Sequence, residues 1–503
     1  MTPEEKKSLY RVNGDGDPLV LPPPRPSKTF LGRLDASLKR HMPTLWITFK
    51  VVVVLLLVLL VMLLLFIAWN NYQGTRELDA ARADAKTTGR SLSMQELIAE
   101  LPSVSEDQNA ANLYEKAFLL LDKRGVRPGA PFVPFVSVVT IDYRSTDVDK
   151  QKALQRDHEM LQKDPAASFP AYMLEASIKY LDERRDVLDL LEKASSMPLC
   201  RYHLLLGRNE WYVPRLGTAR SAARVMALSA WVSAEEGNGP EAISRIRQAL
   251  AIARSLEDEP FAGLTGRAVM YITIAALPRV LARVDLPDSA LEPLQDDLQA
   301  LADGASVRPL AASELARFCD FADPVVRGQV SLRSLLKANQ PWIDISSMPG
   351  FTMSRLPAWC IRGQLKRDEA RTMRFLLDFY DRADNSSPGL LPTQRPPVTS
   401  TDMALYPLFC METPSFARYA NSPQETRAKL ASTAACIAAL RYKNDHGSWP
   451  DSLDALVPDY ISAVPIDPFS GEPPTYLIDQ DSISVVFVGK GSFEIMRKPP
   501  SFE

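Results

Sequence analysis

The stretch Val51–Ala68 reads VVVVLLLVLLVMLLLFIA, an unbroken apolar run of about 18 residues that is long enough for a membrane helix. Trp46 and Trp69 bracket the run, and indole rings favour the two membrane–water interfaces. Lys50 lies close enough to one end for its ammonium group to reach water. A buried core helix of a soluble protein rarely runs this long without a polar residue. The run therefore predicts one transmembrane helix over residues 44–69.

The residues that flank the run distinguish a retained membrane anchor from a cleaved signal peptide. A signal peptide has a shorter apolar core followed by small residues, whereas Trp69, Asn70, Asn71 and Tyr72 follow this run. We therefore expect an uncleaved signal anchor that crosses the lipid bilayer once. The counts of Lys and Arg on its two sides differ little, and the small bias favours a cytoplasmic amino terminus. The bulk of the chain is then expected on the extracytoplasmic side.

The segments beside the anchor have the composition of connecting chain. Residues 1–43 are rich in Pro and Gly, cannot bury much apolar surface, and are expected to form a disordered cytoplasmic tail. The string PPPRP at 22–26 fits either a polyproline ligand or a spacer, and the spacer is favoured. Residues 70–90 are expected to form a juxtamembrane linker.

Length, charge and cysteine content limit the classes of function. The 503 residues suffice for two or three domains outside the membrane, and the net charge of −3 gives no basic excess, so nucleic acid is not an expected partner. The five cysteines are scattered and odd in number, which does not indicate the disulfide framework of a small secreted module. One or two bridges remain open at this stage.

Outside the membrane the dominant signal is helical, and we expect a mainly α fold with a helical-hairpin domain over 91–307. A helix from Thr218 and another after the turn at 237–239 each carry a stripe of small apolar residues, so the two are expected to lie antiparallel. Helices are expected at 93–101, 109–123, 147–163, 171–195, from 218 to the turn at 237–239, around 242–253, about 270–284, 288–301, 311–339 and 363–383, with a short strand at 136–141. Residues 308–421 are expected to form a helical, Pro-rich continuation.

The last segment, 422–503, is expected to form a small α+β module. An Ala-rich helix over 425–445 ends at His446-Gly447, where glycine supplies the left-handed stop, and a β-rich run follows at 483–488. Between them lie turn-forming residues: Trp449, Pro450, Pro465, Asp467, Pro468, Gly471 and Pro473.

Three resemblances follow from these strings. The segment RYKNDHGSWPDSLDALVPDYISAVPIDPFSGEPPTY resembles the carboxy-terminal region of the type II secretion major pseudopilin, although the methylated phenylalanine of that family is absent from the start of this anchor. AEEGNGPEAISRIRQALAIA resembles one tetratricopeptide (TPR) hairpin, and no array of such repeats is present. From Ser91 to the end, the order of parts is similar to a group of uncharacterised, singly anchored bacterial envelope proteins, which implies the cytoplasmic membrane as location and leaves the activity open.

Each candidate for catalysis or metal binding lacks part of its set. Cys200 and His203 have C-x-x-H spacing without a second zinc pair, and His158-Glu159 lacks the second His of a zinc protease helix. Ser334 and Lys337 fit S-x-x-K, but the companion S-D-N and K-T-G motifs are missing. Asp479 and Asp481 match the pseudopilin calcium loop poorly. We therefore expect no catalytic, cofactor-binding or metal-ligating residues and no cofactor.

Two residue sets admit a binding or a purely structural interpretation. The aromatic residues Trp211, Tyr212, Trp342, Phe351 and Trp359 fit a binding groove or a packed core, and the core is favoured. The mixed charges of 183–186 are typical of a solvated helix face.

The function expected from these observations is a non-enzymatic, protein-binding or scaffold component of the cell envelope, with envelope proteins as partners. Two alternatives stay open: an accessory of a type II secretion or pilus-like assembly, and an envelope hydrolase with an unrecognised site. The oligomeric state does not follow from the sequence.

Overall fold

The computed structural model describes most of the chain from Pro43 onward. The described residues are 43–124, 133–135, 148–206, 211–213, 215–257, 259, 262–306, 308–334, 356–384, 405–410, 422–479, 482–487 and 492–496. The chain forms two units, Met1–Trp69 and Asn70–Glu503. The expected tail over 1–43 falls almost wholly outside the described residues, as does the expected strand at 136–141.

The apolar run lies in one long helix, α2 (Pro43–Thr87), which starts in the first unit and ends in the second. The part over Ile47–Thr87 is long and apolar enough to cross a membrane, and its most apolar window is 0% buried. Among the described helices α10 (Gly263–Arg283) meets the same criteria, but its window is 67% buried and it contains the buried Arg279. α10 is therefore a core helix, and the expected apolar helix near the amino terminus is confirmed.

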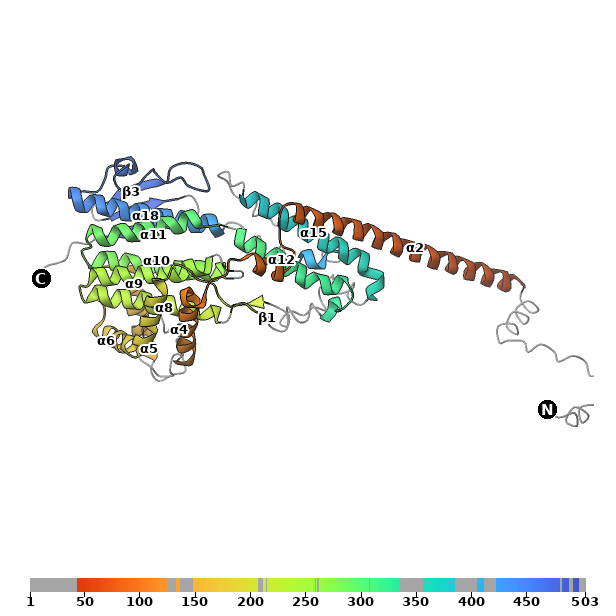
Figure 1. The fold of residues 1–503 in the computed structure, drawn as a ribbon, viewed down its shortest axis with the longest axis horizontal. Helices are drawn as coiled ribbons and strands as arrows, with labels where there is room; N and C mark the ends of the chain where they lie inside the picture. The colour runs from red at the N-terminus through yellow and green to blue at the C-terminus, as the bar shows by residue number, and fades with distance from the viewer. Residues whose placement is uncertain are drawn as a thin grey trace, which may run out of the picture. The chain divides into compact units, whose positions relative to one another are not determined.

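The second unit is mainly helical (Figure 1). Besides α10 its helices are α3 (Met94–Glu100), α4 (Ala110–Arg124), α5 (Val148–Lys163), α6 (Ala171–Asp182), α7 (Arg185–Ser195), α8 (Leu216–Glu235), α9 (Gly239–Glu257), α11 (Asp288–Gly304), α12 (Arg308–Val326), α15 (Ala358–Asp384) and α18 (Ser422–His446). The 3-10 helices η2 (Glu106–Gln108) and η4 (Leu453–Leu456) and the strands β1 (Leu205–Leu206), β2 (Trp211–Tyr212), β3 (Thr475–Asp479), β4 (Ser482–Val486) and β5 (Ser492–Met496) complete the described elements.

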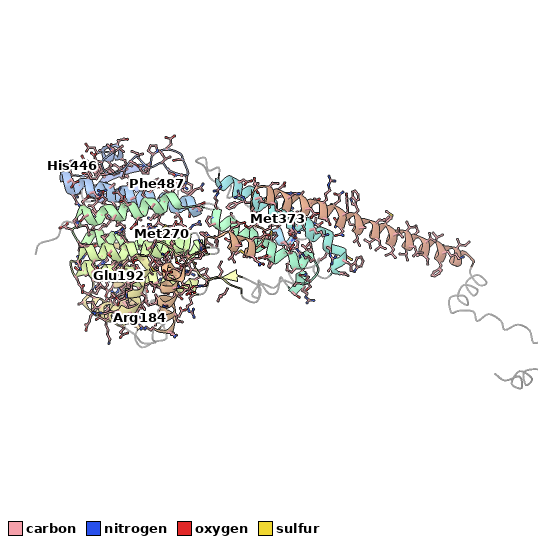
Figure 2. The ribbon with its side chains drawn as sticks, in the orientation of Figure 1. Arg184, Glu192, Met270, Met373, His446 and Phe487 are labelled. Carbon is pink, nitrogen blue, oxygen red and sulfur yellow. The ribbon has the colours of Figure 1, made fainter. Side chains whose placement is uncertain are left out.

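A first hydrophobic core is built by α4, α6–α11, α18 and the strand β4. α8, α9, α10, α11 and α18 form one stack in Figure 1, in which α8, α9 and α10 contact one another, α11 contacts α9, and α18 contacts α11. The small-residue stripe on α8 is buried, as Ala219, Ala222 and Ala230 show, which allows α9 and α10 to approach closely. Met270 and Phe487, labelled in Figure 2, are both buried in this core.

Two of the predicted helices break or end earlier than expected. The single helix expected at 171–195 is two helices, because the chain turns at Glu183 and Arg184. The expected solvated charge face is also wrong at Arg184, which is 5% exposed, lies over the Tyr180 ring and is labelled in Figure 2. The helix expected at 311–339 ends at Val326, because Gly328 turns the chain with a φ of +78°.

The carboxy-terminal segment combines α18 with an antiparallel sheet in the order β3-β4-β5, in which Leu477 pairs with Ser484. The β-rich run predicted at 483–488 corresponds to β4, the central strand, and β3 and β5 flank it. α18 packs on β4 and β5. Its other neighbour is α11, where Arg441 binds Asp288 and its Nη1 donates to Gln295 Oε1 at 3.1 Å. Residues 428–487 therefore share the first core with the preceding helices.

A second hydrophobic core joins α12 and α15 to the end of α2. Leu78, Ala81 and Ala85 of α2 are buried in it together with Phe318 of α12 and Met373 of α15, which Figure 2 labels. Residues 70–87, expected as a juxtamembrane linker, are thus helical and packed. The segments 335–355, 385–404 and 411–421 of the expected Pro-rich continuation lie outside the described residues.

Candidate functional site

The most distinctive polar and close-packed arrangement in the described residues is the seam between α2 and α15. At its start two glycines face each other: a methyl group on Gly74 would lie 2.3 Å from the Gly363 carbonyl oxygen. A methyl group on Gly363 would lie 2.6 Å from the Asn70 carbonyl oxygen and the Asn71 nitrogen. Both distances are far below van der Waals contact, so glycine is required at both positions for this close helix approach.

A lysine continues the seam next to the glycine contact. Lys366 Nζ donates to Asn71 Oδ1 at 3.1 Å and to Thr75 Oγ1 at 2.7 Å. Burial lowers the pKa of Lys366, with the positive charges of Arg362 and Arg82 acting in the same direction. The two hydrogen bonds fix α15 against α2 one turn beyond Gly363.

Three charged residues from three helices meet further along the seam. Arg82 of α2 binds Asp323 of α12, and its Nη2 lies 2.8 Å from Glu369 Oε1 of α15. Glu369 has no exposed side-chain surface, and its Oε2 has no hydrogen-bond partner among the described atoms. Burial raises the pKa of Glu369 to about 7, although Arg82 opposes this shift.

The neighbouring carboxyl, Asp368, binds a different segment. Its Oδ2 and Oδ1 accept the backbone N–H groups of Leu408 (2.7 Å) and Phe409 (2.9 Å). Asp368 is fully buried, and burial raises its pKa to about 8 despite these two hydrogen bonds. Arg371, one turn later on α15, lies over the rings of Tyr406 and Phe409. Asp368 therefore holds residues 405–410 on the surface of α15.

The carboxyls of this seam hold elements together: Glu369 pairs with Arg82 of α2, and Asp368 binds the backbone of residues 408 and 409. The sequence prediction missed Gly74, Arg82, Gly363, Asp368 and Glu369. The only signal was the spacing of Leu78, Ala81 and Ala85, which marks one helix face inside the expected linker.

The sequence candidates for metal or nucleophile chemistry are not brought together. Burial raises the pKa of the Cys200 thiol to about 12, whereas His203 is 59% exposed and lies 3.5 Å from Glu115. Ser334 Oγ lies 2.7 Å from Ser331 Oγ, and Lys337 is outside the described residues. Within the described part of the chain, no group of three or more His, Cys, Asp or Glu residues is arranged to hold a metal ion, and the cysteines form no disulfide.

The aromatic candidates divide between the described and undescribed parts. Trp359 begins α15 and is 57% exposed, so the favoured interpretation of a buried core residue is wrong for it. Trp211 and Tyr212 form β2, which pairs with β1. Trp342 and Phe351 lie outside the described residues.

The residues that carry the pseudopilin resemblance have folding roles in this chain. Gly447 ends α18 with a φ of +78°, and the Trp449 ring lies 4.1 Å from Lys443 Nζ. Pro450 accepts a hydrogen bond at its carbonyl from the Tyr476 hydroxyl at 3.0 Å. Asp467 is buried, and its Oδ1 accepts the Phe469 N–H at 2.8 Å, which closes the turn before β3. Asp479 ends β3, and Asp481 is outside the described residues.

A polar hollow lies between α7, α9 and α11 in the first core's surface, with a volume of about 280 Å³. Asp297 of α11 lies 2.6 Å from Arg247 Nε and 3.1 Å from Arg254 Nη2, so two cations of α9 meet one carboxylate. Ser195, Ser244 and Glu192, the last of which Figure 2 labels, also line the hollow. Its size and mixed charge suit a short polar segment better than an apolar cofactor.

Comparison with known proteins adds no functional assignment. No known protein family, no curated protein and no solved structure matches the chain.

Proposed function

We propose that the chain is a single-pass protein of the bacterial cytoplasmic membrane whose folded part lies on the extracytoplasmic side and binds other envelope proteins without catalysing a reaction. The observation that carries the proposal is α2, an uninterrupted helix from Pro43 to Thr87. Its apolar part is exposed over Ile47–Phe66, whereas Leu78, Ala81 and Ala85 are buried in the second core. An exposed run of this length needs a hydrocarbon environment.

The seam supports a scaffold role because it packs the end of α2 into the second core. Gly74 against Gly363, Lys366 against Thr75 and Arg82 against Glu369 supply three successive contacts. The folded part that would hold a partner is therefore built on the helix that continues from the apolar run.

The polar hollow of the first core is the surface that we propose for the partner. It is formed by three helices that are distant in the chain, so its shape is set by the fold. Serine hydroxyls and the Arg247–Asp297–Arg254 group offer donors and acceptors to an extended polar peptide.

In-cell cross-linking of the tagged full-length protein, followed by mass spectrometry, tests this function. We expect reproducible capture of a few envelope proteins, and a marked loss of that capture in the double variant Arg247→Ala, Arg254→Ala. The matched control is Arg185→Ala, which removes an arginine that is 78% exposed and paired only within its own turn. Capture of abundant background alone, or equal capture by all three proteins, contradicts a binding role for the hollow.

A further inference from the structure

The second core ends in an exposed surface with an unusual composition. α2 and α15 run in the same direction, because contacts pair Asn71 with Lys366 near the start and Arg82 with Glu369 further along. Gly363 lies against Asn70, the first residue of this unit. Residues before Gly363 on α15 therefore lie at the end of the core from which α2 enters it.

That end exposes large apolar side chains. Trp359, one helical turn before Gly363, is 57% exposed, and Leu356 just before α15 is 52% exposed. Leu405 belongs to the same end because its carbonyl accepts Gln364 Nε2 at 2.9 Å, and its side chain is exposed. On α2, Tyr72 is exposed as well.

α12 brings basic residues to the same end. It runs opposite to α15, since Asp323 meets the Arg82–Glu369 pair whereas the following Arg327 carbonyl meets Arg362 Nη2 at 3.4 Å. The described segments at this end are 70–76, 327–334, 356–366 and 405–410. The charged residues in these segments are Arg76, Arg327, Arg333, Arg362 and Lys366, and Arg327 pairs with Asp323 of α12 at 2.5 Å. We call this surface, made of those four segments, the basic-aromatic face.

We propose that the basic-aromatic face docks on the surface of the lipid bilayer, with Trp359, Leu356 and Leu405 in the interfacial layer and the arginines on anionic phospholipid headgroups. The inference rests on the proposed membrane anchoring by α2. The apolar run ends at Ala68, two residues before the start of this face, and α2 is continuous there. Aromatic side chains prefer the interfacial layer, and basic side chains beside it bind anionic headgroups.

Charge selects this occupant over a second copy of the chain. The face carries an excess of cations even with Asp323 paired to Arg327, so two identical faces repel each other, whereas the phosphates of a bilayer complement the face.

Photo-cross-linking in vesicles tests this inference. p-Benzoylphenylalanine replaces Trp359 in the full-length protein, which is reconstituted into vesicles of phosphatidylethanolamine and phosphatidylglycerol that contain an alkyne-tagged phospholipid. We expect a lipid adduct at position 359. Two reference positions are Leu57 in the apolar run and Tyr172 on α6, which is 47% exposed and distant in sequence from the face. Position 57 should give the adduct and position 172 should not.

The positions separate failure of the inference from failure of the anchoring proposal. An adduct at 57 without one at 359 overturns the docking and keeps the anchor, whereas no adduct at 57 overturns both. A protein adduct at 359 in place of lipid also overturns it, because another chain then covers the face. The variant Arg327→Ala, Arg333→Ala removes cations from the face and should lower the adduct yield at 359 by up to about fivefold per arginine. Vesicles of phosphatidylcholine, which carry no net headgroup charge, should lower the yield for the unmodified face as well.

Discussion

Adjacent carboxyls on α15 illustrate how much one residue step changes in a helix. Asp368 and Glu369 differ by about 100° around the helix axis, so they face different neighbours. Asp368 accepts backbone N–H groups of Leu408 and Phe409, whereas Glu369 meets Arg82. Both carboxyls are buried. In both, the cost of desolvating the charged form exceeds the stabilisation that its partners give it, so both pKa values are raised.

These shifts predict that the second core loses stability as pH rises. A carboxyl whose pKa is higher in the folded state binds more protons there than in the unfolded state, so the free energy of unfolding falls with pH. For Glu369 the loss begins near its ordinary pKa of 4.5 and is complete above its folded pKa of about 7. Asp368 extends the same loss from about 4 toward 8. Unfolding of the detergent-solubilised protein between pH 5 and 8.5 measures the slope.

The variant Glu369→Gln isolates one of the two groups. Glutamine keeps an oxygen for Arg82 and does not titrate, so the slope between pH 5 and 7 should flatten by up to about 1.4 kcal/mol per pH unit. Glu175→Gln, a change of a non-buried carboxylate on α6, is the control and should leave the slope unchanged. An unaltered slope in Glu369→Gln would show that this carboxyl is already ionised in the folded protein at pH 5.

The local sequence around Asp368 and Glu369 gives no sign that these two carboxyls are buried. The string RDEAR over 367–371 has the composition of a solvated helix face, and nothing local distinguishes Asp368 from Asp378. The information lies in partners that are far away in the chain: Arg82 is 287 positions from Glu369. Arg184 was misjudged for a different reason: the ring that covers it, Tyr180, is only four residues away, but a string of mixed charges does not show which side chain folds back over a nearby ring.

At the level of elements, sequence periodicity predicted best where a helix packs on its sequence neighbours. The α8–α9 pair follows from small-residue stripes and the turn at Gly237, whose φ is +77°. The pairing of α2 with α15 and of α18 with α11 could not be predicted in this way, because each joins segments that are far apart in sequence. The positions of the flanking strands β3 and β5 were not predicted, because short strands carry little periodic signal.

The seam between α2 and α15 predicts a strong effect of a single methyl group. Gly74→Ala places a carbon 2.3 Å from the Gly363 carbonyl oxygen, so the helices must separate, at a cost of about 1–3 kcal/mol. Hydrogen exchange of α2 and α15 amides should become faster, with little change in α8 and α9. Gly217→Ala, in the first turn of α8 with no atom within 4 Å of the added methyl, is the matched control. Equal protection in the Gly74 and Gly217 variants would refute a tight seam.

For the molecule as a whole, chain order and core membership do not coincide. The second core takes residues from 78–85, then 311–379, then 408, and the first core takes 110–302 and 428–487. A division of the sequence into successive blocks therefore separates α18 from the α11 helix that it packs on. Deletion of 422–503 would expose the α11 face and remove the Arg441–Asp288 pair, so it would perturb the fold as well as any binding role.

The orientation of the whole molecule yields the last prediction: alkaline phosphatase fused after Glu503 should be active, and green fluorescent protein fused there should be dark. The reason is that five basic residues (Arg25, Lys28, Arg33, Lys39 and Arg40) lie within about 20 residues before the predicted span, whereas three (Arg76, Arg82 and Lys86) lie within the same distance after it. The basic residues retained in the cytoplasm are then those of the amino-terminal side. Phosphatase fused after Arg40, before the run, is the control and should be inactive. A fluorescent, phosphatase-negative fusion at Glu503 would instead put the domain in the cytoplasm and require cytoplasmic partners.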